Sequence, residues 1–483
     1  MTDEMKPENS SGIPGWGGFE FGRRLGLKAA GVIAASGALV SLADVSTAYA
    51  ATKSSTIKIG FVSPRTGALA DFAGPDNFVL HKIRASSYFA KGITIGRTKY
   101  KIEITEKDTQ SLGNIAVQVT QELINSGVDL ILVSSAPETT IPVATTCEQY
   151  KIPCVSTVVP WEAYWGGFTG ATISPEGGAT GTGPTYNSMF FFGVPQFVGT
   201  FVPMWQKIQR KTKCNSNVAE MFPNDSDGNA FRAAFAPTVG AIYPSGGYNF
   251  VDGGAYTDLS TDYTSMIEKF KTGGKSGASC DLFINCPLPP DFQTFWTQAS
   301  QQNYNPKLAT VAKVMLFPTD AYALGALSNN IATDAWFTPY SPYKSSLTGL
   351  TAYEFCAEYQ TANNGKNGQW VQSMGSTYSL FEVAIQGLKK VTNPHDRLAL
   401  AKALQSVNYN GMCGPINMNS KSKDPMVASP AKGIAMIQPV GVQWKAGSKD
   451  LVGHKKYKWS QWVVDNSLNK KIPLNGTLEP TNA

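Results

Sequence analysis

The sequence has little of what metal and redox chemistry requires. It contains only three histidines, His81, His395 and His454, which lie far apart along the chain. None of its seven cysteines forms a C-x-x-C pair, so neither a zinc site nor a thioredoxin-like centre is indicated. The dinucleotide, phosphate-loop and nucleophile-elbow motifs are also absent. We therefore expect no metal, no cofactor and no catalytic residue, and an exported enzyme is the least favoured class.

The charge balance excludes a further class of partner. The chain has 41 Lys and Arg against 35 Asp and Glu, a net charge of +6, and its basic side chains form no long run. A nucleic acid is therefore not an expected partner. Hydrophobic residues make up 42% and aromatic residues 11%, which is enough to bury sizeable cores. A chain of 483 residues is too long for one core, so two or three domains are expected.

The first 50 residues resemble an export signal. Paired arginines, Arg23 and Arg24, precede a weakly apolar stretch and a small-residue cleavage pattern that ends at Ala50. The pattern resembles a twin-arginine signal, but the flanking glycines depart from it, so general secretory export stays open. The apolar stretch falls short of the ~20 residues that span a bilayer. No cysteine lies near the cleavage site, so we expect a soluble periplasmic protein without a lipid anchor.

The odd number of cysteines leaves at least one thiol unpaired within the chain. Export into an oxidising compartment favours disulfides among the others. Cys147 and Cys154 flank a short helix-to-strand turn that could bring them together. Cys214 and Cys280 each precede a strand-like run, which would place them at the same end of neighbouring strands. These four cysteines are the disulfide candidates, and their connectivity is open.

Short apolar strands alternate with helical patterns over most of the chain. One series runs from about residue 56 to 157, and a second from about residue 204 to 312. Such alternation is typical of βαβ units around a parallel sheet. The sequence therefore predicts an α/β fold with two doubly wound parallel-sheet lobes. Between the two series, residues 166–185 are rich in Gly and Thr and lack periodicity, which predicts a long loop.

The order of the segments resembles a known family. The run IGFVSPRTGALADFAG, the block VDLILVSSAPETTIPVATTCEQYKIPCVS and the later runs MFPNDSDGNAF, SCDLFINCPLPPDFQTFWTQASQQNY and GMCGPINMN follow one another as in type I periplasmic solute-binding proteins of the leucine/isoleucine/valine-binding family. The resemblance covers nearly all of residues 56–444. It implies two lobes joined by three crossover segments, which we expect near residues 189–195, 335–341 and 434–440.

This resemblance also implies a division of the chain and a function. The division is listed here: residues 1–50 form the export signal, 56–190 with 342–434 form lobe 1, 193–336 with 436–465 form lobe 2, and 466–483 form a polar tail. The implied function is that of a monomeric receptor that captures a small solute and delivers it to the membrane permease of an ABC importer. A ligand-sensing receptor of a signalling system is the alternative, because the same fold serves both roles.

In open α/β sheets ligands bind beyond the carboxyl ends of the strands, so the loops there supply the candidate contacts. Phe72 occupies the place where the family usually has an aromatic side chain over the ligand. Ser135, Thr139 and Thr140 precede or begin a helix, where hydroxyl and N–H groups suit a carboxylate. The alternatives are a loop-anchoring aromatic and simple capping of the helix.

Further candidates follow other strands. Trp161 and Trp165 add aromatic rings after the fourth strand, either to stack on a planar ligand or to pack between the lobes and the long loop. In lobe 2, Asp227 lies in a turn cluster after a strand, and Asn285 ends a strand; both are candidate polar contacts.

Lys313 bears on the charge of the ligand. Amino-acid-binding members of the resembled family place an acidic residue in the loop after the last strand of lobe 2, and an ungapped alignment puts Lys313 there. A buried lysine repels an ammonium group and attracts a carboxylate. This favours a carboxylate-bearing ligand with a flat, aromatic body. The alternative is a solvent-facing Lys313 that pairs with Asp320 or with nothing.

Overall fold

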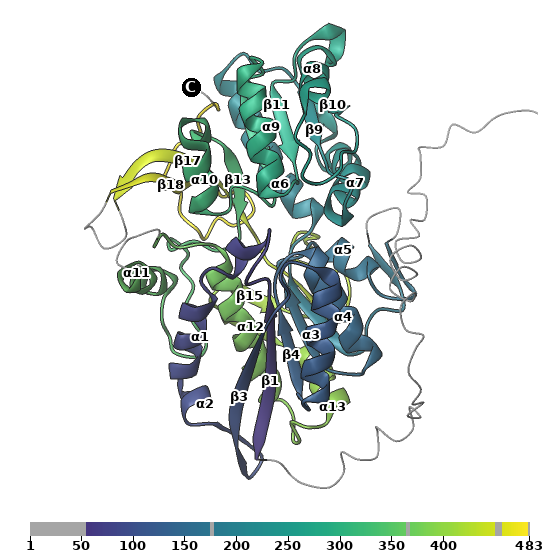
Figure 1. The fold of residues 1–483 in the computed structure, drawn as a ribbon, viewed down its shortest axis with the longest axis vertical. Helices are drawn as coiled ribbons and strands as arrows, with labels where there is room; N and C mark the ends of the chain where they lie inside the picture. Colours follow the sequence, from purple (N-terminus) through teal and green to yellow (C-terminus); the bar gives the residue numbers. More distant parts are fainter. Residues whose placement is uncertain (1–54, 174–177, 364–367, 450–455, 482–483) are drawn as a thin grey trace, which may run out of the picture.

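Two seven-stranded sheets, each covered by helices, lie end to end in the molecule (Figure 1). The computed structural model describes residues 55–173, 178–363, 368–449 and 456–481. We call the part around the first sheet lobe 1 and the part around the second lobe 2. The predicted export signal lies outside the described residues.

The sheet of lobe 1 has the order β16-β8-β5-β4-β1-β3-β2, and its strands are parallel except for the pairing of β2 with β3. Its strands are β1 (Thr56–Ser63), β2 (Ile93–Ile95), β3 (Thr98–Asp108), β4 (Leu130–Val133), β5 (Cys154–Thr157), β8 (Asn187–Phe191) and β16 (Ile434–Met436). Its helices are η1 (Ala70–Ala73), α1 (Asp76–Ala85), α2 (Ser87–Ala90), α3 (Gly113–Asn125), α4 (Pro137–Gln149), α5 (Trp161–Gly166), α11 (Ala352–Ala362), α12 (Ser373–Leu388) and α13 (Arg397–Leu404). A hairpin of β14 (Asn408–Gly411) and β15 (Gly414–Asn417) follows α13.

The sheet of lobe 2 has the order β10-β9-β11-β12-β13-β17-β18, with an antiparallel hairpin at one end. Its strands are β9 (Asn217–Met221), β10 (Asn249–Asp252), β11 (Leu282–Asn285), β12 (Leu308–Val311), β13 (Ala332–Ala335), β17 (Val440–Lys449) and β18 (Lys456–Asp465). Its helices are α6 (Val194–Lys211), α7 (Ser226–Ile242), η2 (Pro244–Gly246), α8 (Thr264–Thr272), η3 (Lys275–Gly277), α9 (Pro289–Gln301), α10 (Pro318–Leu324) and η4 (Gly325–Ser328).

The sequence pattern explains these elements. Strand β4 is apolar at every position and fully buried, as expected for a parallel strand with helices on both faces. Helix α3 buries Ala116, Val119 and Leu123, which recur at the three- and four-residue spacing of one helical face. The prediction of two parallel-sheet α/β lobes is therefore confirmed.

The chain passes between the lobes three times. The first passage is Phe192–Gly193, between β8 and α6, and the third is Ile437–Pro439, between β16 and β17. The second, residues 336–351, runs from β13 to α11 and is longer. All three connections begin within the segments in which we expected a crossover.

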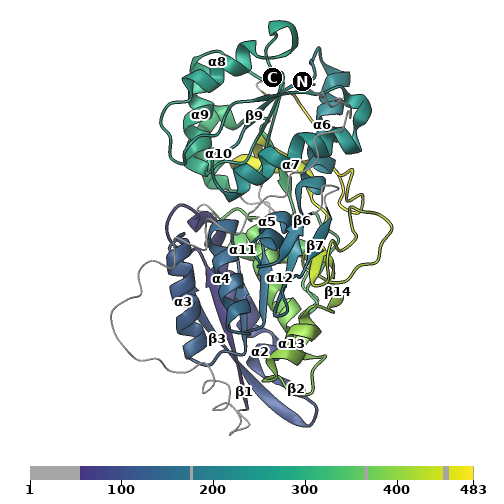
Figure 2. The same cartoon turned by 90° about the vertical axis from the view of Figure 1, so that its right-hand side faces the viewer.

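The predicted loop at residues 166–185 contains structure that we did not expect. Strands β6 (Ala171–Ile173) and β7 (Ala179–Gly181) pair antiparallel and lie beside α5, near the junction of the lobes (Figure 2). The indole N–H of Trp165 donates to the carbonyl oxygens of Thr172 and Thr180, at 3.1 Å in each case. The prediction of a plain loop was wrong here because a tryptophan outside the segment holds its two short strands together.

The predicted disulfides are also wrong. All seven cysteines are free thiols, so Cys147 and Cys154 are not joined, and neither are Cys214 and Cys280. The turn between α4 and β5 does bring Cys147 beside Cys154. Burial and a hydrogen bond with Cys154 raise the pKa of the Cys147 thiol well above its ordinary value. The buried Cys147 thiol is therefore held in its neutral form.

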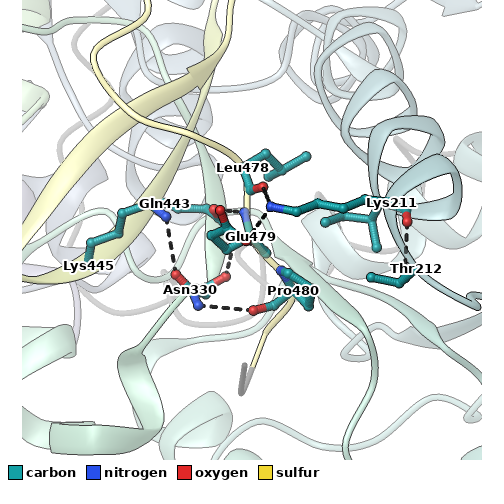
Figure 3. Close-up of polar contacts among 9 residues, drawn as sticks. Lys211, Thr212, Asn330, Gln443, Lys445, Leu478, Glu479 and Pro480 are labelled. Carbon is teal, nitrogen blue, oxygen red and sulfur yellow. Dashed lines mark hydrogen bonds and ion pairs between the residues drawn. The ribbon is translucent and has the colours of Figure 1, made fainter.

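The segment after β18 packs onto lobe 2 instead of extending as a polar tail. Ile472 and Leu478 are buried in it. The Glu479 backbone and the Gln443 side chain exchange two hydrogen bonds, and the Asn330 amide donates to the Pro480 carbonyl at 3.0 Å (Figure 3). These contacts attach the segment to β17 and to the turn before β13.

Several buried carboxyl groups have raised pKa values, because each has no cation beside it or shares its cation with other carboxyl groups. Burial raises the pKa of six of them, to about 8 for Glu220 and to about 7 for the other five. These groups are Asp76, Glu162, Glu220, Asp227, Asp320 and Asp334. Each therefore keeps its proton to a higher pH in the folded protein than in the unfolded chain.

This predicts that the protein becomes less stable as the pH rises from 5.5 to 8. The folded state binds more protons than the unfolded state between the two sets of pKa values, so its stability is greatest below that window and falls as pH rises through it. We expect the melting temperature to be roughly 3–6 °C higher at pH 5.5 than at pH 8. Replacing Glu162 with Gln should reduce the difference. A melting temperature that rises with pH over this range would contradict the prediction.

Candidate functional site

A cavity lies between the lobes, beyond the carboxyl ends of their strands. Its volume is about 40 Å³, and both lobes contribute to its wall. The lining residues are Phe72, Ala136, Pro137, Val158, Pro160, Phe191, Phe197, Asp227, Phe231, Cys286, Ala312, Lys313, Leu316, Asp334 and Trp336. Most of this wall is apolar and much of it is aromatic, while three of the lining side chains carry an ionisable oxygen or nitrogen. The composition of this wall suits a small solute with an apolar body and few polar groups, which the cavity would admit only after the lobes move apart.

Lys313 is the centre of charge in this cavity. Its Nζ lies 2.7 Å from Glu138 Oε1, 2.9 Å from Asp227 Oδ2 and 3.6 Å from Asp225 Oδ2. Its side chain is 6% exposed. Burial opposes the charge of Lys313, but Asp227, Glu138 and Asp225 outweigh it and hold the pKa well above the ordinary value. The alternative that Lys313 faces solvent or pairs with Asp320 is therefore wrong.

The loop that follows β9 holds two of these carboxylates in place. Asp225 precedes helix α7, and its Oδ1 accepts a hydrogen bond from the Gly228 N–H at 2.6 Å. Asp227 lies in the first turn of the helix and is buried. Burial raises the pKa of Asp227 to about 7, against the lowering effect of Lys313. The predicted residue Asp227 therefore does line the cavity, as a partner of Lys313.

The hydroxyl groups after β4 lie on the lobe 1 side. Thr139 Oγ1 donates to the Ser135 carbonyl at 2.7 Å, and the hydroxyls of Ser134 and Ser135 are hydrogen-bonded to one another. Thr140 is fully buried, and its hydroxyl has no hydrogen-bond partner among the described residues. Helix α4 begins after Ala136, so none of these side chains caps it. The cavity wall contains the neighbours Ala136 and Pro137 but none of the predicted hydroxyl residues themselves.

The aromatic predictions have mixed outcomes. Phe72 lines the cavity and packs edge to face on Phe317 of lobe 2, with ring centroids 4.8 Å apart. Trp161 is buried at the first crossover, where its backbone N–H donates to the Phe192 carbonyl at 3.2 Å. Trp165 binds the β6–β7 hairpin. Neither tryptophan reaches the cavity wall, so the packing alternative holds for both.

Four rings that we did not predict line the cavity instead: Phe191, Phe197, Phe231 and Trp336. Phe191 and Trp336 pack edge to face, with centroids 5.1 Å apart, and Phe197 packs on Phe231 at 5.0 Å. Phe191 and Trp336 flank the first and second crossovers. Runs of aromatic residues at the predicted crossovers were the available signal for them.

Two further polar residues differ from expectation. Asn285 ends β11 and is fully buried, and neither atom of its amide has a partner among the described residues. The cavity wall contains the next residue, Cys286, and not Asn285. Asp334, which we did not predict, lines the cavity from β13. In the sequence Asp334 is an ordinary residue of a strand, so its place on the cavity wall is known only from the fold.

Several contacts join the two lobes. Besides the pairs Lys313–Glu138 and Phe72–Phe317, Thr319 of lobe 2 donates a hydrogen bond to Asp71 of lobe 1 at 2.7 Å. These three contacts join η1 or the first turn of α4 in lobe 1 to the segment that follows β12. The structure is therefore a closed form of the two lobes.

Neither a metal centre nor a membrane span is found in the described part of the chain. No three or more His, Cys, Asp or Glu side chains there are grouped so as to hold a metal ion. No helix among the described residues is sufficiently long and apolar to cross a membrane.

Comparison with known proteins places this fold in a family. The family described as "Periplasmic binding protein" matches residues 56–430, which is more than half of the chain. No curated protein sequence matches the chain significantly.

Solved structures of similar fold include three with informative names. A leucine-binding protein LivK from Thermotoga maritima is 15% identical, with a TM-score of 0.60 over 84% of this chain and 98% of its own. LivJ from Streptococcus pneumoniae, in complex with isoleucine, is 15% identical, with a TM-score of 0.58 over 84% and 99% of the two chains. A solute-binding protein of an ABC transporter from Rhodopseudomonas palustris HaA2, in complex with p-hydroxybenzoic acid, is 13% identical, with a TM-score of 0.61 over 86% and 99%.

These identities establish similarity of fold, and the match of the family establishes membership. The two α/β lobes agree with both comparisons. The chain therefore belongs to the periplasmic binding proteins, with the type I fold of their leucine-, isoleucine- and valine-binding members.

Proposed function

We propose that this protein is an exported receptor that binds a small aromatic carboxylate between its lobes and delivers it to the membrane permease of an ABC importer. The observation that carries the proposal is Lys313, a buried ammonium group on the wall of a largely apolar cavity. Residues 1–50 would direct export to the periplasm, and the mature protein would act as a monomer that binds without catalysis.

The aromatic residues of the cavity wall support the proposal that the ligand contains a flat ring. Phe72 comes from lobe 1, and Phe197 and Phe231 come from helices of lobe 2, so a ring between the lobes would contact both. Aromatic side chains bind rings through edge-to-face and offset contacts as well as through apolar burial. Proteins of similar fold support this class, because one is in complex with p-hydroxybenzoic acid and another with 3,4-dihydroxy benzoic acid.

The position of Glu138 supports the proposal that the ligand carries a carboxylate. In the closed form its carboxylate lies 2.7 Å from Lys313 Nζ, where an anionic group of a ligand would also pair. Glu138 belongs to lobe 1 and Lys313 to lobe 2, so opening of the lobes would separate them. A ligand carboxylate could then replace Glu138 and form a charge-assisted hydrogen bond with the same ammonium group.

This proposal predicts which solutes stabilise the protein. Mature protein from residue 51 should be screened by thermal shift and then by calorimetry against benzoate, 4-hydroxybenzoate, 3,4-dihydroxybenzoate, leucine and isoleucine. We expect the aromatic acids to raise the melting temperature, because a ligand present at 100 times its Kd stabilises the folded state by about 2.7 kcal/mol. Leucine and isoleucine should have little effect, since their ammonium group would lie beside Lys313.

The matched ligand control is benzamide, which keeps the ring and lacks the negative charge. It should bind at least roughly tenfold more weakly than benzoate, because a hydrogen bond to a charged partner contributes about 1.5–3 kcal/mol. Tight binding of a zwitterionic amino acid, or equal binding of benzamide and benzoate, would show that the proposed ligand class is wrong.

A further inference from the structure

Asp334 is a polar residue on the cavity wall that the proposed function does not yet use. Its side chain is 1% exposed, and Oδ1 has no hydrogen-bond partner among the described residues. The other two charged residues of the wall, Asp227 and Lys313, pair with one another at 2.9 Å. Buried polar atoms of folded proteins are almost always hydrogen-bonded. The unpaired oxygen of a residue on the cavity wall is therefore a position for a hydrogen-bond donor of the ligand.

Asp334 lies apart from the charge centre at Lys313. Lys313 lowers the pKa of Asp227, Asp258 and Asp291, which surround it. Burial raises the pKa of Asp334 to about 7, and only a hydrogen bond with its own backbone opposes the shift. Among the described residues Lys313 forms ion pairs with Glu138, Asp225 and Asp227 and not with Asp334, so Asp334 is a second polar position on the cavity wall.

The backbone around Asp334 is held in place from lobe 1. The Gln372 side chain donates to the Asp334 carbonyl at 2.9 Å and accepts from the Trp336 N–H at 3.0 Å. Gln372 is fully buried, and the Trp336 indole donates to Ser376 Oγ at 3.3 Å. The Asp334 side chain is thus presented to the cavity by a fixed strand end, which is how a specificity-determining group is best placed.

We propose that Asp334 determines specificity by forming a hydrogen bond with a hydroxyl group on the ring of the ligand, at the end opposite the carboxylate. This inference rests on the proposed function, because Lys313 must hold the acidic end. The hydroxyl supplies the partner that Oδ1 lacks. A ring without the hydroxyl leaves the buried carboxyl unpaired, and a site built for a hydroxyl group discriminates strongly against an analogue that lacks it.

The test is calorimetry with benzoate and 4-hydroxybenzoate on the wild-type protein, Asp334→Asn and Asp334→Leu. The wild type should bind 4-hydroxybenzoate at least about tenfold more tightly than benzoate. In Asp334→Leu this preference should vanish, because affinity for 4-hydroxybenzoate falls while affinity for benzoate stays within about threefold. Asp334→Asn keeps a hydrogen-bonding side chain and should retain part of the preference.

Asp320→Asn is the matched control variant. Asp320 is likewise buried in lobe 2 with its pKa raised to about 7 by burial, but it lies outside the cavity wall. This substitution should leave both affinities unchanged. Circular dichroism should verify that each variant folds; if Asp334→Leu does not, the wild-type preference and its reduction in Asp334→Asn decide the question.

Two outcomes would overturn the inference, and they are distinguishable from failure of the proposed function. Equal affinities of the wild type for the two acids would refute a hydroxyl contact while leaving the aromatic carboxylate in place. An equal loss of both affinities in the Asp334 variants would show a structural role only. Binding of neither acid by the wild type would refute the proposed function, and this inference with it.

Discussion

Replacing Lys313 with methionine is expected to destabilise the protein by about 3–5 kcal/mol, because removing one partner from a buried ion pair leaves the other charge uncompensated. Here Glu138, Asp225 and Asp227 would remain without their shared cation. The same substitution should lower the affinity for an aromatic carboxylate at least roughly a hundredfold, since the charged partner of the ligand is lost. Urea unfolding and calorimetry measure the two effects separately.

The pH dependence of this variant provides a second readout. Without Lys313, the pKa of Asp227 should rise further, so the folded variant should bind protons more readily than the unfolded chain. Its stability should therefore recover as the pH is lowered from 8 to 6, more steeply than in the wild type. Lys271→Met is the control, because Lys271 forms an exposed ion pair with Glu268 at 2.7 Å. That change should cost less than about 1 kcal/mol. Similar losses in the two variants would disprove a special role of Lys313.

A chain that ends at Asp465 is expected to lose at least about 4 kcal/mol of stability in lobe 2. Burial of Ile472 and Leu478 contributes about 1.5–3 kcal/mol for each side chain. Removing the segment also leaves the Gln443 side-chain oxygen and the Asn330 side-chain N–H without the partners described here, which costs about 1–3 kcal/mol for each buried group left unpaired. Urea unfolding of the two chains measures the difference.

A chain that ends at Thr481 is the matched control, because it keeps every contact described for the segment. It should unfold at the same urea concentration as the full chain. If the chain that ends at Asp465 were as stable as this control, the packed segment would be unimportant for stability, contrary to the contacts observed.

The sequence predicted the parallel part of the fold well and its last strands poorly. Strands such as β4 are buried on both faces, so their apolar runs are visible without any knowledge of the fold. Strand β17 (VGVQWKAGSK) mixes buried and exposed positions and pairs with β18 across an antiparallel hairpin. Its buried Gln443 is satisfied only by Asn330 and Glu479, from distant parts of the chain. The role of such a residue depends on tertiary contacts that no local pattern contains.

The candidate site was predicted only in part, because the direction in which a side chain faces also depends on tertiary contacts. The family resemblance identified Phe72 and Lys313, and the turn cluster after a strand identified Asp227; all three line the cavity. Trp161 and Trp165 also follow a strand at the cleft, but helix α5 directs them toward the crossover and the β6–β7 hairpin. Asp334 was missed because a single carboxylate within a strand has no distinguishing spacing. Which way a side chain faces decided each of these outcomes.

The interleaving of the chain between the lobes has a consequence for the order in which they can form during synthesis. The sheet of lobe 1 lacks one of its edge strands until β16, at Ile434–Met436, has been made. Lobe 2 needs β17, β18 and the contact between Thr481 and Lys307, almost the whole chain. Lobe 1 therefore cannot complete its fold until about nine-tenths of the chain has been made, and lobe 2 cannot do so until almost all of it has been made. Pairings so distant in sequence form slowly, so the newly released chain should pass through a long-lived, incompletely packed state that chaperones or the export machinery can engage before the lobes close.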